Sequence, residues 1–462
     1  MAELWRLGAA ELAELIRKGE TSSREVVDSH LDRIAAVNPS LNAITVTLAE
    51  TARAAADEAD AATAAAGGDH LGPLHGVPFT VKENIDLTGS ATTQGLVAFE
   101  QMQPDLDAPH IAQMKAAGAI PIGRTNLPDF GLRWHSDNAL RGATKNPWDA
   151  TRTAGGSSGG EAASLATGMT PLGMGNDYGG SLRVPAQFCG IASLRPTLGR
   201  VAQASAFQPA DFPISLQLMA VQGPMARRIA DVRLAFESMC GPDPRDPWWT
   251  PAPMTGPAVA RRVAVWRGAD DPQVAGGIDV AADALADAGY EVEEADPPML
   301  AQAAILWQDL VLSDAQGLVD MLRPLFGADA LRFLELAGTI RPGLDGDAYR
   351  QGLVERQGIA RAWSMFQAQS PLILGPVSTR PPFVVGRDID GAGGTAEVLD
   401  SLQLTVVVNL LGLPASVVPV GVSSGLPQVV QLIGPRYRED LCLDAAQAIE
   451  DRVEPITPID PR

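Results

Sequence analysis

The sequence predicts an α/β fold. Short apolar runs typical of buried strands alternate with longer stretches of helical pattern along the 462 residues. No repeat of solenoid length occurs, and no Pro/Ser-rich linker divides the chain. Hydrophobic residues make up 46% of the sequence, which is typical of a globular protein. We therefore expect one domain over residues 1–462, with a peripheral helical part.

The N-terminal part of the chain is predicted to be helical as far as residue 65. Ser22 or Ser23 is a suitable N-cap for a helix with Val26, Val27 and Leu31 on its apolar face. The elements expected after it, up to residue 200, are a helix at 48–66, a strand at 77–81, a helix at 108–117, a strand at 119–122 and a helix at 161–167.

The second half is predicted from the same patterns. The elements expected there are a strand VAVW within 256–268, an amphipathic helix at 278–294, helices over 300–370, apolar runs at 372–376, 404–411, 415–420 and 428–433, and a helix at 438–450. The uncharged stretch 401–435 is interrupted by glycine and proline, so no run of about 20 apolar residues remains. We interpret this stretch as buried strands joined by turns, not as a membrane span.

Charge and cysteine content exclude several classes of protein. The formal net charge of −20 argues against nucleic-acid partners and against docking on anionic lipid. The three cysteines are odd in number and widely spaced, and they form no CxxC pair. The N-terminus carries acidic residues and is unlike a secretory signal. We expect a cytoplasmic protein with no metal or other cofactor and no membrane or nucleic-acid partner.

Lys82 is the first candidate for chemistry. It ends the apolar run VPFTV, whereas the other three lysines lie in polar contexts. A buried lysine has a lowered pKa, so it can be neutral and act as a base. The alternative is an ordinary lysine at the end of a strand whose ammonium group reaches water.

Two glycine-rich segments follow. In Gly155–Gly160 four glycines surround Ser157 and Ser158, a composition unsuited to a helix or strand interior. In the second segment, Gly179 and Gly180 precede Ser181, which leaves successive backbone amides free to converge on a developing oxyanion. Each segment taken alone could also be a plain loop or turn.

Together these segments resemble the amidase signature family. The likeness rests on the glycine- and serine-rich stretch 155–200 and on five shorter motifs, VKENIDL (81–87), NPWD (146–149), FCGIASLRPTLGRV (188–201), NLLGLPA (409–415) and GLPQVVQLIG (425–434). The resemblance implies a large central mixed β-sheet surrounded by helices. It also suggests a division into an N-terminal helical segment (1–65), a catalytic core (66–205), a variable, partly helical, pocket-forming region (205–370) and a C-terminal sheet and helix (371–462).

The resemblance also implies the site. Ser181 matches the nucleophile, Ser157 the bridging serine of a cis peptide bond, and Lys82 the terminal base. The remaining matches comprise the oxyanion amides of Tyr178, Gly179, Gly180 and Ser181, and the supporting residues Ser158, Asp177 and Arg183. The expected reaction is hydrolysis of an amide-type C–N bond through an acyl-enzyme on Ser181.

The substrate is less well defined by the sequence. Tyr178 replaces the threonine usual in this signature, and Val429 stands where glycine is usual. Trp134, His135 and Tyr178 are the expected pocket residues, and Trp134, Trp307 and Trp363 favour an apolar or aromatic substrate, although tryptophans are more often ordinary core residues. Aryl or aliphatic amides and carbamates (urethanes) remain open, as does a homodimeric state. Two alternatives are a glutamine-hydrolysing subunit of a tRNA-dependent amidotransferase and a non-catalytic binding subunit.

Other hydrolase classes fit poorly. The loop satisfies GxSxG twice, but no histidine follows Ser157, and the α/β-hydrolase order requires one. Ser136-Asp137-Asn138 resembles an element of serine β-lactamases, but the sequence contains no SxxK. The five histidines are scattered, so they suggest no metal centre.

Overall fold

The computed structural model describes residues 3–66, 71–205, 211–268 and 270–462. Residues 206–210, at the start of the predicted variable region, therefore lie outside the described residues. The strands are β1 (Ile44–Thr47), β2 (Pro78–Lys82), β3 (Ile120–Thr125), β4 (Leu172–Asp177), β5 (Ala192–Arg195), β6 (Val221–Ala226), β7 (Arg262–Val265), β8 (Glu291–Glu294), β9 (Leu372–Gly375), β10 (Ala415–Ser423) and β11 (Leu426–Ile433). No helix in these ranges is long and apolar enough to cross a membrane.

All the described strands join one mixed sheet, in the order β1-β3-β2-β4-β6-β5-β10-β11-β9-β7-β8. β2 lies between β3 and β4 and is parallel to both. β7 is likewise parallel to β8 and β9, while the strands from β4 through β6, β5, β10 and β11 to β9 pair antiparallel. The expected large mixed sheet is thus confirmed, and strands from the predicted catalytic core and from the C-terminal part lie side by side in it.

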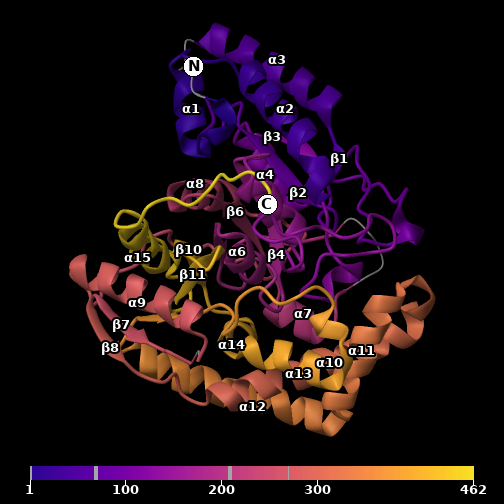
Figure 1. Cartoon of the computed structure of the whole chain (residues 1–462), viewed down its shortest axis with the longest axis vertical. Helices are drawn as coiled ribbons and strands as arrows, with labels where there is room; N and C mark the ends of the chain where they lie inside the picture. Colours follow the sequence, from indigo (N-terminus) through magenta and orange to yellow (C-terminus); the bar gives the residue numbers. More distant parts are fainter. Residues whose placement is uncertain (1–2, 67–70, 206–210, 269) are drawn as a thin grey trace.

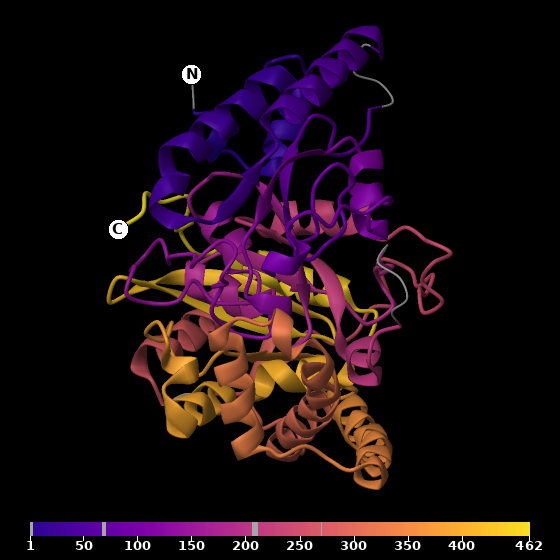
Figure 2. The ribbon, with the colours of Figure 1, turned by 90° about the vertical axis from the view of Figure 1, so that its right-hand side faces the viewer.

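Helices surround the sheet. They are α1 (Ala9–Arg17), α2 (Ser23–Leu41), α3 (Ala49–Ala66), α4 (Pro109–Ala116), α5 (Gly159–Ala166), α6 (Arg183–Cys189), α7 (Ile214–Met219), α8 (Ile229–Met239), α9 (Pro272–Asp287), α10 (Leu300–Leu322), α11 (Ala328–Ile340), α12 (Gly346–Gln367), α13 (Gly391–Ser401), α14 (Gln403–Leu411) and α15 (Glu439–Glu450). Short 3-10 helices span Leu4–Arg6, Val97–Phe99, Asp129–Gly131, Arg323–Leu325 and Arg387–Ile389. Figures 1 and 2 show α1–α3 at one end of the molecule and α10–α13 at the other, with the sheet between them.

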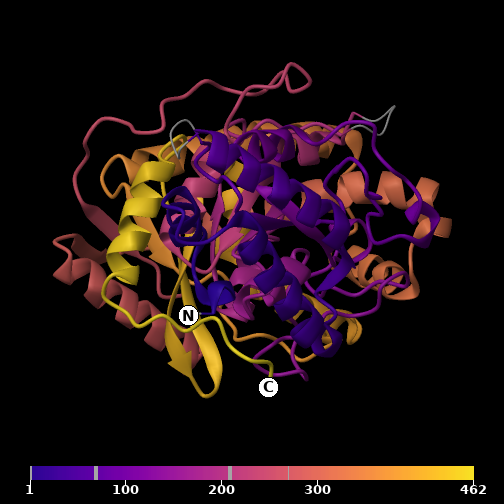
Figure 3. The same cartoon turned by 90° about the horizontal axis from the view of Figure 1, so that it is seen from above.

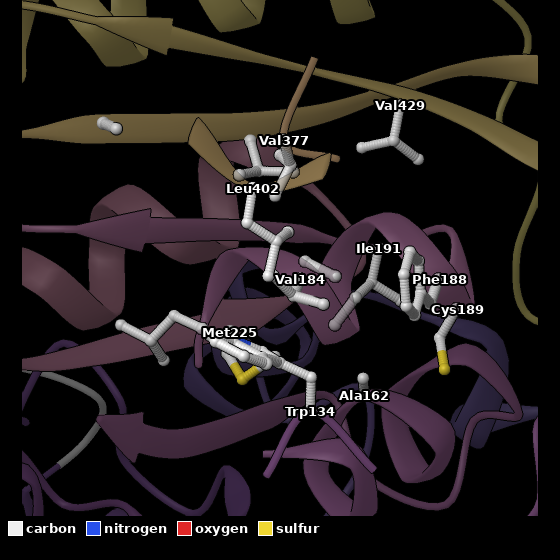
Figure 4. Packing of buried hydrophobic residues seen from close by; sticks show 14 of the residues in the cluster. Trp134, Ala162, Val184, Phe188, Cys189, Ile191, Met225, Val377, Leu402 and Val429 are labelled. Carbon is white, nitrogen blue, oxygen red and sulfur yellow. The ribbon is translucent and has the colours of Figure 1, made fainter. Parts of the chain in front are cut away.

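Each face of the sheet has its own hydrophobic core. Successive strand residues point to opposite faces, so Leu372 and Leu374 of β9 join one core and Ile373 joins the other. The first core packs α1, α4, α8, α9 and α15 on the sheet, and α15 lies beside the β10–β11 hairpin in Figure 3. The second includes α5, α6, α10 and α14, and Figure 4 shows Val184 and Phe188 of α6 within it, between Val429 and Trp134. Both faces are therefore covered, which explains the nearly continuous apolar character of the central strands.

The N-terminal 65 residues contain a strand that the prediction missed. Ser22 is the N-cap of α2: its Oγ accepts from the Glu25 amide at 3.0 Å. The helix ends at Leu41 and is capped by Asn42, whose φ is +55°, and the Asn38 side chain accepts from the Ile44 amide at 2.8 Å. Ile44–Thr47 then pairs with β3 as β1. The prediction that residues 1–65 contain only helices was wrong, because a short β-branched run carries little periodicity.

We expected residues 404–411 to be a strand, and this expectation was also wrong. They form most of α14, are all buried, and are followed by the capping residue Gly412, where φ is +65°. A fully buried apolar run looks the same in sequence whether it is a helix or a strand, so periodicity could not distinguish the two.

The helix predicted over 278–294 is displaced. α9 begins at Pro272, with the Asp271 side chain accepting from the Gln273 amide at 2.9 Å, and it ends at Asp287. Gly289 follows with φ at +83°, and residues 291–294 form the edge strand β8. The acidic sequence of β8 concealed the strand, because an exposed edge strand has no apolar face to reveal it.

Candidate active site

The site begins at the end of β2. Lys82 is the last residue of this strand, and its side chain is completely buried. Its Nζ lies 2.7 Å from Ser157 Oγ and 2.7 Å from Asn176 Oδ1. The amide nitrogen of Asn176 donates to Asn84 Oδ1 at 3.0 Å, which fixes the oxygen of Asn176 toward the lysine. An amide oxygen only accepts, so it takes an N–H of Lys82 and leaves the rest of the amine facing Ser157.

Burial sets the protonation of Lys82. Desolvation lowers the pKa of this lysine to about 7, although the negative charges of Asp177 and Glu161 oppose the shift. A neutral amine is therefore well populated near neutral pH and can accept a proton. The alternative of a lysine whose ammonium group reaches water is excluded by its complete burial.

Glu161 is a second buried ionisable group behind the lysine. It lies on α5, and its carboxylate accepts from Thr80 Oγ1 at 2.6 Å and from Thr125 Oγ1 at 2.8 Å. Burial raises the pKa of Glu161 to about 7, while the two threonine hydrogen bonds and the charge of Lys82 act against that rise. The strands β2 and β3 thus surround a second titrating group close to the predicted base.

Ser157 lies in the glycine-rich loop before α5, and the Gly156–Ser157 peptide bond is cis, as the resemblance implied. Ser136 Oγ holds this loop: it donates to the Gly155 carbonyl at 3.0 Å and accepts from the Gly159 amide at 3.0 Å. Gly155 has φ at +88°, and a Cβ there would meet the Pro185 Cα at 2.6 Å. Glycine is therefore required at this position by both its conformation and its surroundings.

Ser181 lies in the turn between β4 and α6, and 6% of its surface is exposed. The Ser158 amide donates to the Ser181 carbonyl at 3.3 Å, which joins the two serine loops. Among the described residues no hydrogen bond connects Ser157 Oγ with Ser181 Oγ. The structure therefore contains the first link of the predicted relay, from Lys82 to Ser157, and places the second pair on adjoining loops.

Asp177 organises the turn that carries Ser181. Its carboxylate accepts from the Gly180 amide at 2.8 Å and from the Leu182 amide at 3.2 Å, and it pairs with Arg183 at 3.0 Å. Burial alone would raise the pKa of Asp177, but the Arg183 guanidinium outweighs it and holds the pKa well below its usual range. Asn409 Nδ2 donates to the same carboxylate at 2.7 Å. The turn is therefore built on a permanently charged, fully buried anchor.

The four predicted oxyanion amides are not equivalent. Gly180 already donates to Asp177, so this amide serves the turn. Among the described residues, the amides of Tyr178, Gly179 and Ser181 have no protein acceptor. Two carbonyls of the loop accept from tryptophans: Trp134 Nε1 donates to the Gly179 carbonyl at 2.8 Å, and Trp307 Nε1 donates to the Tyr178 carbonyl at 3.3 Å.

Aromatic rings pack against this loop. Trp307 lies 6.2 Å from the Tyr178 ring and 6.4 Å from the Trp134 ring, and Phe333 lies 5.9 Å from Trp134, measured between ring centroids. A Cβ on Gly179 would meet Trp307 Cζ2 at 2.6 Å, so the rings touch the loop backbone itself. Trp134 and Tyr178 were expected near the pocket, and Phe333 on α11 was not.

Other predicted residues lie elsewhere. Trp363 is 1% exposed and donates to the Pro298 carbonyl at 2.8 Å, so it is a core residue and its use as a sign of an aromatic substrate was wrong. His135 is buried with Nδ1 at 2.9 Å from Thr153 Oγ1, and its amide nitrogen lies against Gly156. His135 therefore packs against the backbone of the Ser157 loop.

Two supporting residues, Asn176 and Asn409, were missed by sequence reasoning. Asn176 directly precedes Asp177 on β4, and Asn409 begins the NLLGLPA motif, so the motifs contained them without indicating a role. Ser158, which was predicted as a supporting hydroxyl, has a buried Oγ with no hydrogen-bond partner among the described residues. The described part of the chain contains no cluster of three or more histidine, cysteine or acidic residues that could hold a metal ion.

The chain matches known proteins along nearly its whole length. The Amidase family model matches residues 25–443. An indoleacetamide hydrolase of Bradyrhizobium diazoefficiens is 41% identical over 97% of this chain and 87% of its own length. A glutamyl-tRNA(Gln) amidotransferase subunit of Roseiflexus castenholzii is 34% identical over 98% of this chain and 97% of its own length.

Solved structures agree with the sequence matches. A 6-aminohexanoate cyclic dimer hydrolase superposes with a TM-score of 0.85 at 28% identity, covering 100% of this chain and 99% of that one. A bacterial aryl acylamidase superposes with a TM-score of 0.82 at 25% identity, covering 97% of this chain and 96% of that one.

Proposed function

The chain belongs to the amidase signature family, and on that premise we propose that it hydrolyses the primary amide of an arylacetamide, of the indoleacetamide kind, to the acid and ammonia. That it is a hydrolase of carbon–nitrogen bonds other than peptide bonds follows from the family match and the relatives. The choice of substrate is supported by the name of the 41% identical relative, an indoleacetamide hydrolase.

The observation that supports an aromatic substrate most strongly is the packing of aromatic rings on the loop before Ser181. Trp134 and Trp307 both donate to carbonyls of this loop, so their rings are fixed against its backbone. Apolar and aromatic walls with a few polar groups are typical of small-molecule sites. The rings of Tyr178, Trp134 and Trp307 make the surroundings of this loop aromatic, which suits an aryl group one methylene from its carboxamide.

Ser181, Ser157 and Lys82 form the proposed proton relay. Neutral Lys82 accepts the proton of Ser157, Ser157 accepts the proton of Ser181, and Ser181 Oγ attacks the amide carbonyl. The relay then delivers a proton to the amide nitrogen, so ammonia leaves and an ester on Ser181 remains. Water, deprotonated by the same relay, cleaves the ester and releases the acid.

The loop amides complete the proposed site. Tyr178, Gly179 and Ser181 are the amides available to an oxyanion, because the Gly180 amide donates to Asp177. We propose that the Ser157–Ser181 hydrogen bond forms when a substrate carbonyl occupies these amides, since catalytic hydrogen bonds commonly tighten in the reacting complex. Asp177 and Arg183 support the turn, and Ser158 fixes it through its backbone amide.

A second candidate is glutamine hydrolysis within an amidotransferase, because the Roseiflexus relative is 34% identical along nearly the whole chain. Free glutamine needs charged partners for its α-ammonium and carboxylate groups. The buried guanidinium of Arg133, the residue before Trp134, is already paired with Asp388 at 2.9 Å and with Asp329 at 3.3 Å, and that of Arg183 is paired with Asp177 at 3.0 Å. The charge pairing therefore favours the arylacetamide.

Ammonia release from a matched panel tests the proposal. The panel contains indole-3-acetamide, phenylacetamide, butyramide, L-glutamine and an aryl carbamate, with Ser181→Ala as the control for background hydrolysis. We expect the two arylacetamides to have the highest kcat/KM. Higher kcat/KM for glutamine would favour the second candidate, and preference for butyramide or the carbamate would contradict the arylacetamide assignment.

We also propose that the protein acts in the cytoplasm, on small-molecule substrates. Cys189, Cys240 and Cys442 are all unpaired, which suits a reducing compartment. Fractionation of the native host followed by immunodetection would test this location.

A further inference from the structure

Tyr178 differs from the threonine usual at this position of the family signature, and its side chain makes a connection that a threonine could not reach. The phenol oxygen lies 2.5 Å from Ser215 Oγ on α7. Ser215 is completely buried, and its Oγ lies 2.5 Å from Asp314 Oδ2 on α10. The loop that carries the oxyanion amides is thereby connected to the helical part of the molecule.

The directions of these hydrogen bonds follow from the chemistry of the groups. A carboxylate only accepts, so Ser215 donates to Asp314. The Ser215 oxygen is then the acceptor for the Tyr178 hydroxyl. Burial raises the pKa of Tyr178, so its hydroxyl keeps the proton that it donates. Asp314 Oδ2 also accepts from the Ser215 amide at 2.8 Å and from Tyr349 OH at 3.0 Å, which fixes the carboxylate in place.

α10 holds Tyr178 at two points, the backbone carbonyl and the side-chain hydroxyl. Trp307 and Asp314 are seven residues apart on α10, two helical turns, so they lie on the same face of the helix. Trp307 Nε1 donates to the Tyr178 carbonyl, and its ring lies 6.2 Å from the tyrosine ring. Asp314 holds the other end, the hydroxyl, through Ser215.

The backbone end of this contact bears directly on the site. The Tyr178 carbonyl and the Gly179 amide belong to one peptide group, and a planar trans peptide directs them in opposite directions. Fixing the carbonyl toward Trp307 therefore fixes the Gly179 N–H away from Trp307. We propose that Tyr178 is a positioning residue through which α10 orients the Gly179 amide toward the oxyanion. This proposal rests on the proposed role of Ser181 and its loop.

Two single variants and their combination test the clamp formed by Tyr178, Ser215 and Asp314. Tyr178→Phe removes the hydroxyl and keeps the ring, and Ser215→Ala breaks the same connection at its next member. Each is expected to lower kcat about ten- to a hundredfold with KM unchanged, because a misplaced donor weakens transition-state binding alone. The double variant should lose no more than either single variant, since both remove one connection. Tyr290→Phe, a phenol outside the site, is the matched control.

The choice of substrates separates positioning of the Gly179 amide from direct contact with the substrate and from no role in catalysis. Amides with aryl and with alkyl acyl groups should lose kcat by the same factor if the clamp positions the amide. A loss confined to aryl substrates, or a rise in KM, would overturn the proposal in favour of direct substrate contact. Variants that match wild type on every hydrolysed amide would also overturn it. Wild-type inactivity on arylacetamides alone would instead refute the proposed substrate, and inactivity on all amides would refute both proposals.

Thermal unfolding measurements show whether a variant loses activity because it has lost its fold. If Tyr178→Phe and Ser215→Ala keep the Tm of wild type and still lose kcat, the effect belongs to the site. If their kcat recovers fully at lower temperature, where the fold is intact, the clamp contributes stability only and the proposal fails.

Discussion

Lys82 Nζ lies 2.7 Å from Ser157 Oγ at the buried end of β2, with parallel strands on either side. This contact joins a base with a lowered pKa to the loop that contains the cis peptide, and the proposed chemistry depends on it. From this pair the proposed relay runs outward to Ser181 and to the turn that carries it.

Removing the base should remove activity. Lys82→Met keeps the length of the side chain without the amine, so kcat should fall about 100- to 10,000-fold, the range typical of a lost general base. Steady-state kinetics on the best amide would measure this. Lys115→Met, at an exposed lysine on α4, is the control and should retain wild-type kcat. Near-normal turnover of Lys82→Met at neutral pH would contradict the relay.

The pH profile should report the same amine. The reaction needs neutral Lys82, whose pKa is lowered to about 7, so kcat/KM should rise with pH and level off above a midpoint near 7. A profile that stays flat from pH 5 to 9 would be inconsistent with lysine as the base. The measurement is kcat/KM across this pH range in buffers of constant ionic strength.

Asn176→Asp should move that midpoint upward. The new carboxylate would lie against Lys82 Nζ, where Asn176 Oδ1 is now 2.7 Å away, and an opposite charge stabilises the ammonium form. A higher lysine pKa means that more alkaline pH is needed for the neutral form. Asn176→Ala adds no charge and should cause no upward shift. If the midpoint of the pH profile moves to lower pH in Asn176→Asp, the rise of kcat/KM with pH belongs to a group other than Lys82.

Replacing Ser181 by alanine should lower kcat more than replacing Ser157. Ser181→Ala removes the attacking oxygen and should lower kcat on the order of a millionfold. Ser157→Ala should cost less, because a water molecule can bridge Lys82 and Ser181 in the space left by the hydroxyl. Single-turnover measurements on both variants would compare them. Equal losses would show that Ser157 has no substitute.

Asp177→Asn should destabilise the fold. The Asp177–Arg183 pair is fully buried on both sides, and removing one charge of such a pair costs about 3–5 kcal/mol in unfolding free energy. Glu291→Gln, in the exposed pair with Arg262, should cost less than about 1 kcal/mol. Urea unfolding followed by circular dichroism compares the two. Equal effects would mean that Asp177 is no structural anchor.

The local parts of the site were predictable from the sequence. Lys82 closes an apolar run, and Ser157 and Ser181 lie among glycines, so the sequence drew attention to them, and the resemblance to the family implied their roles. Short apolar runs also predicted the α/β class and most strands. The predictions at α14 and β8 were wrong, because a fully buried helix lacks a polar face and an exposed edge strand lacks an apolar one.

Contacts between distant segments could not be predicted. Phe333 on α11 reaches Trp134, and Asp314 on α10 reaches Tyr178 through Ser215, and none of these pairs shares a local pattern. The bond from the Gly180 amide to Asp177 depends on turn geometry and left no mark in the sequence. The variable region 205–370 contains none of the family motifs, so the contacts of its helices with the loop before Ser181 were found only in the structure.

Covalent trapping of Ser181 tests the central claim most directly. Wild-type protein treated with a serine-directed aryl phosphonate should gain one adduct, which peptide mass spectrometry would locate on Ser181, and the labelling rate should fall in Lys82→Met. Ser181→Ala should remain unlabelled. An adduct on Ser157 or Ser158, or no adduct on a folded and active protein, would contradict the account of Ser181 as the nucleophile.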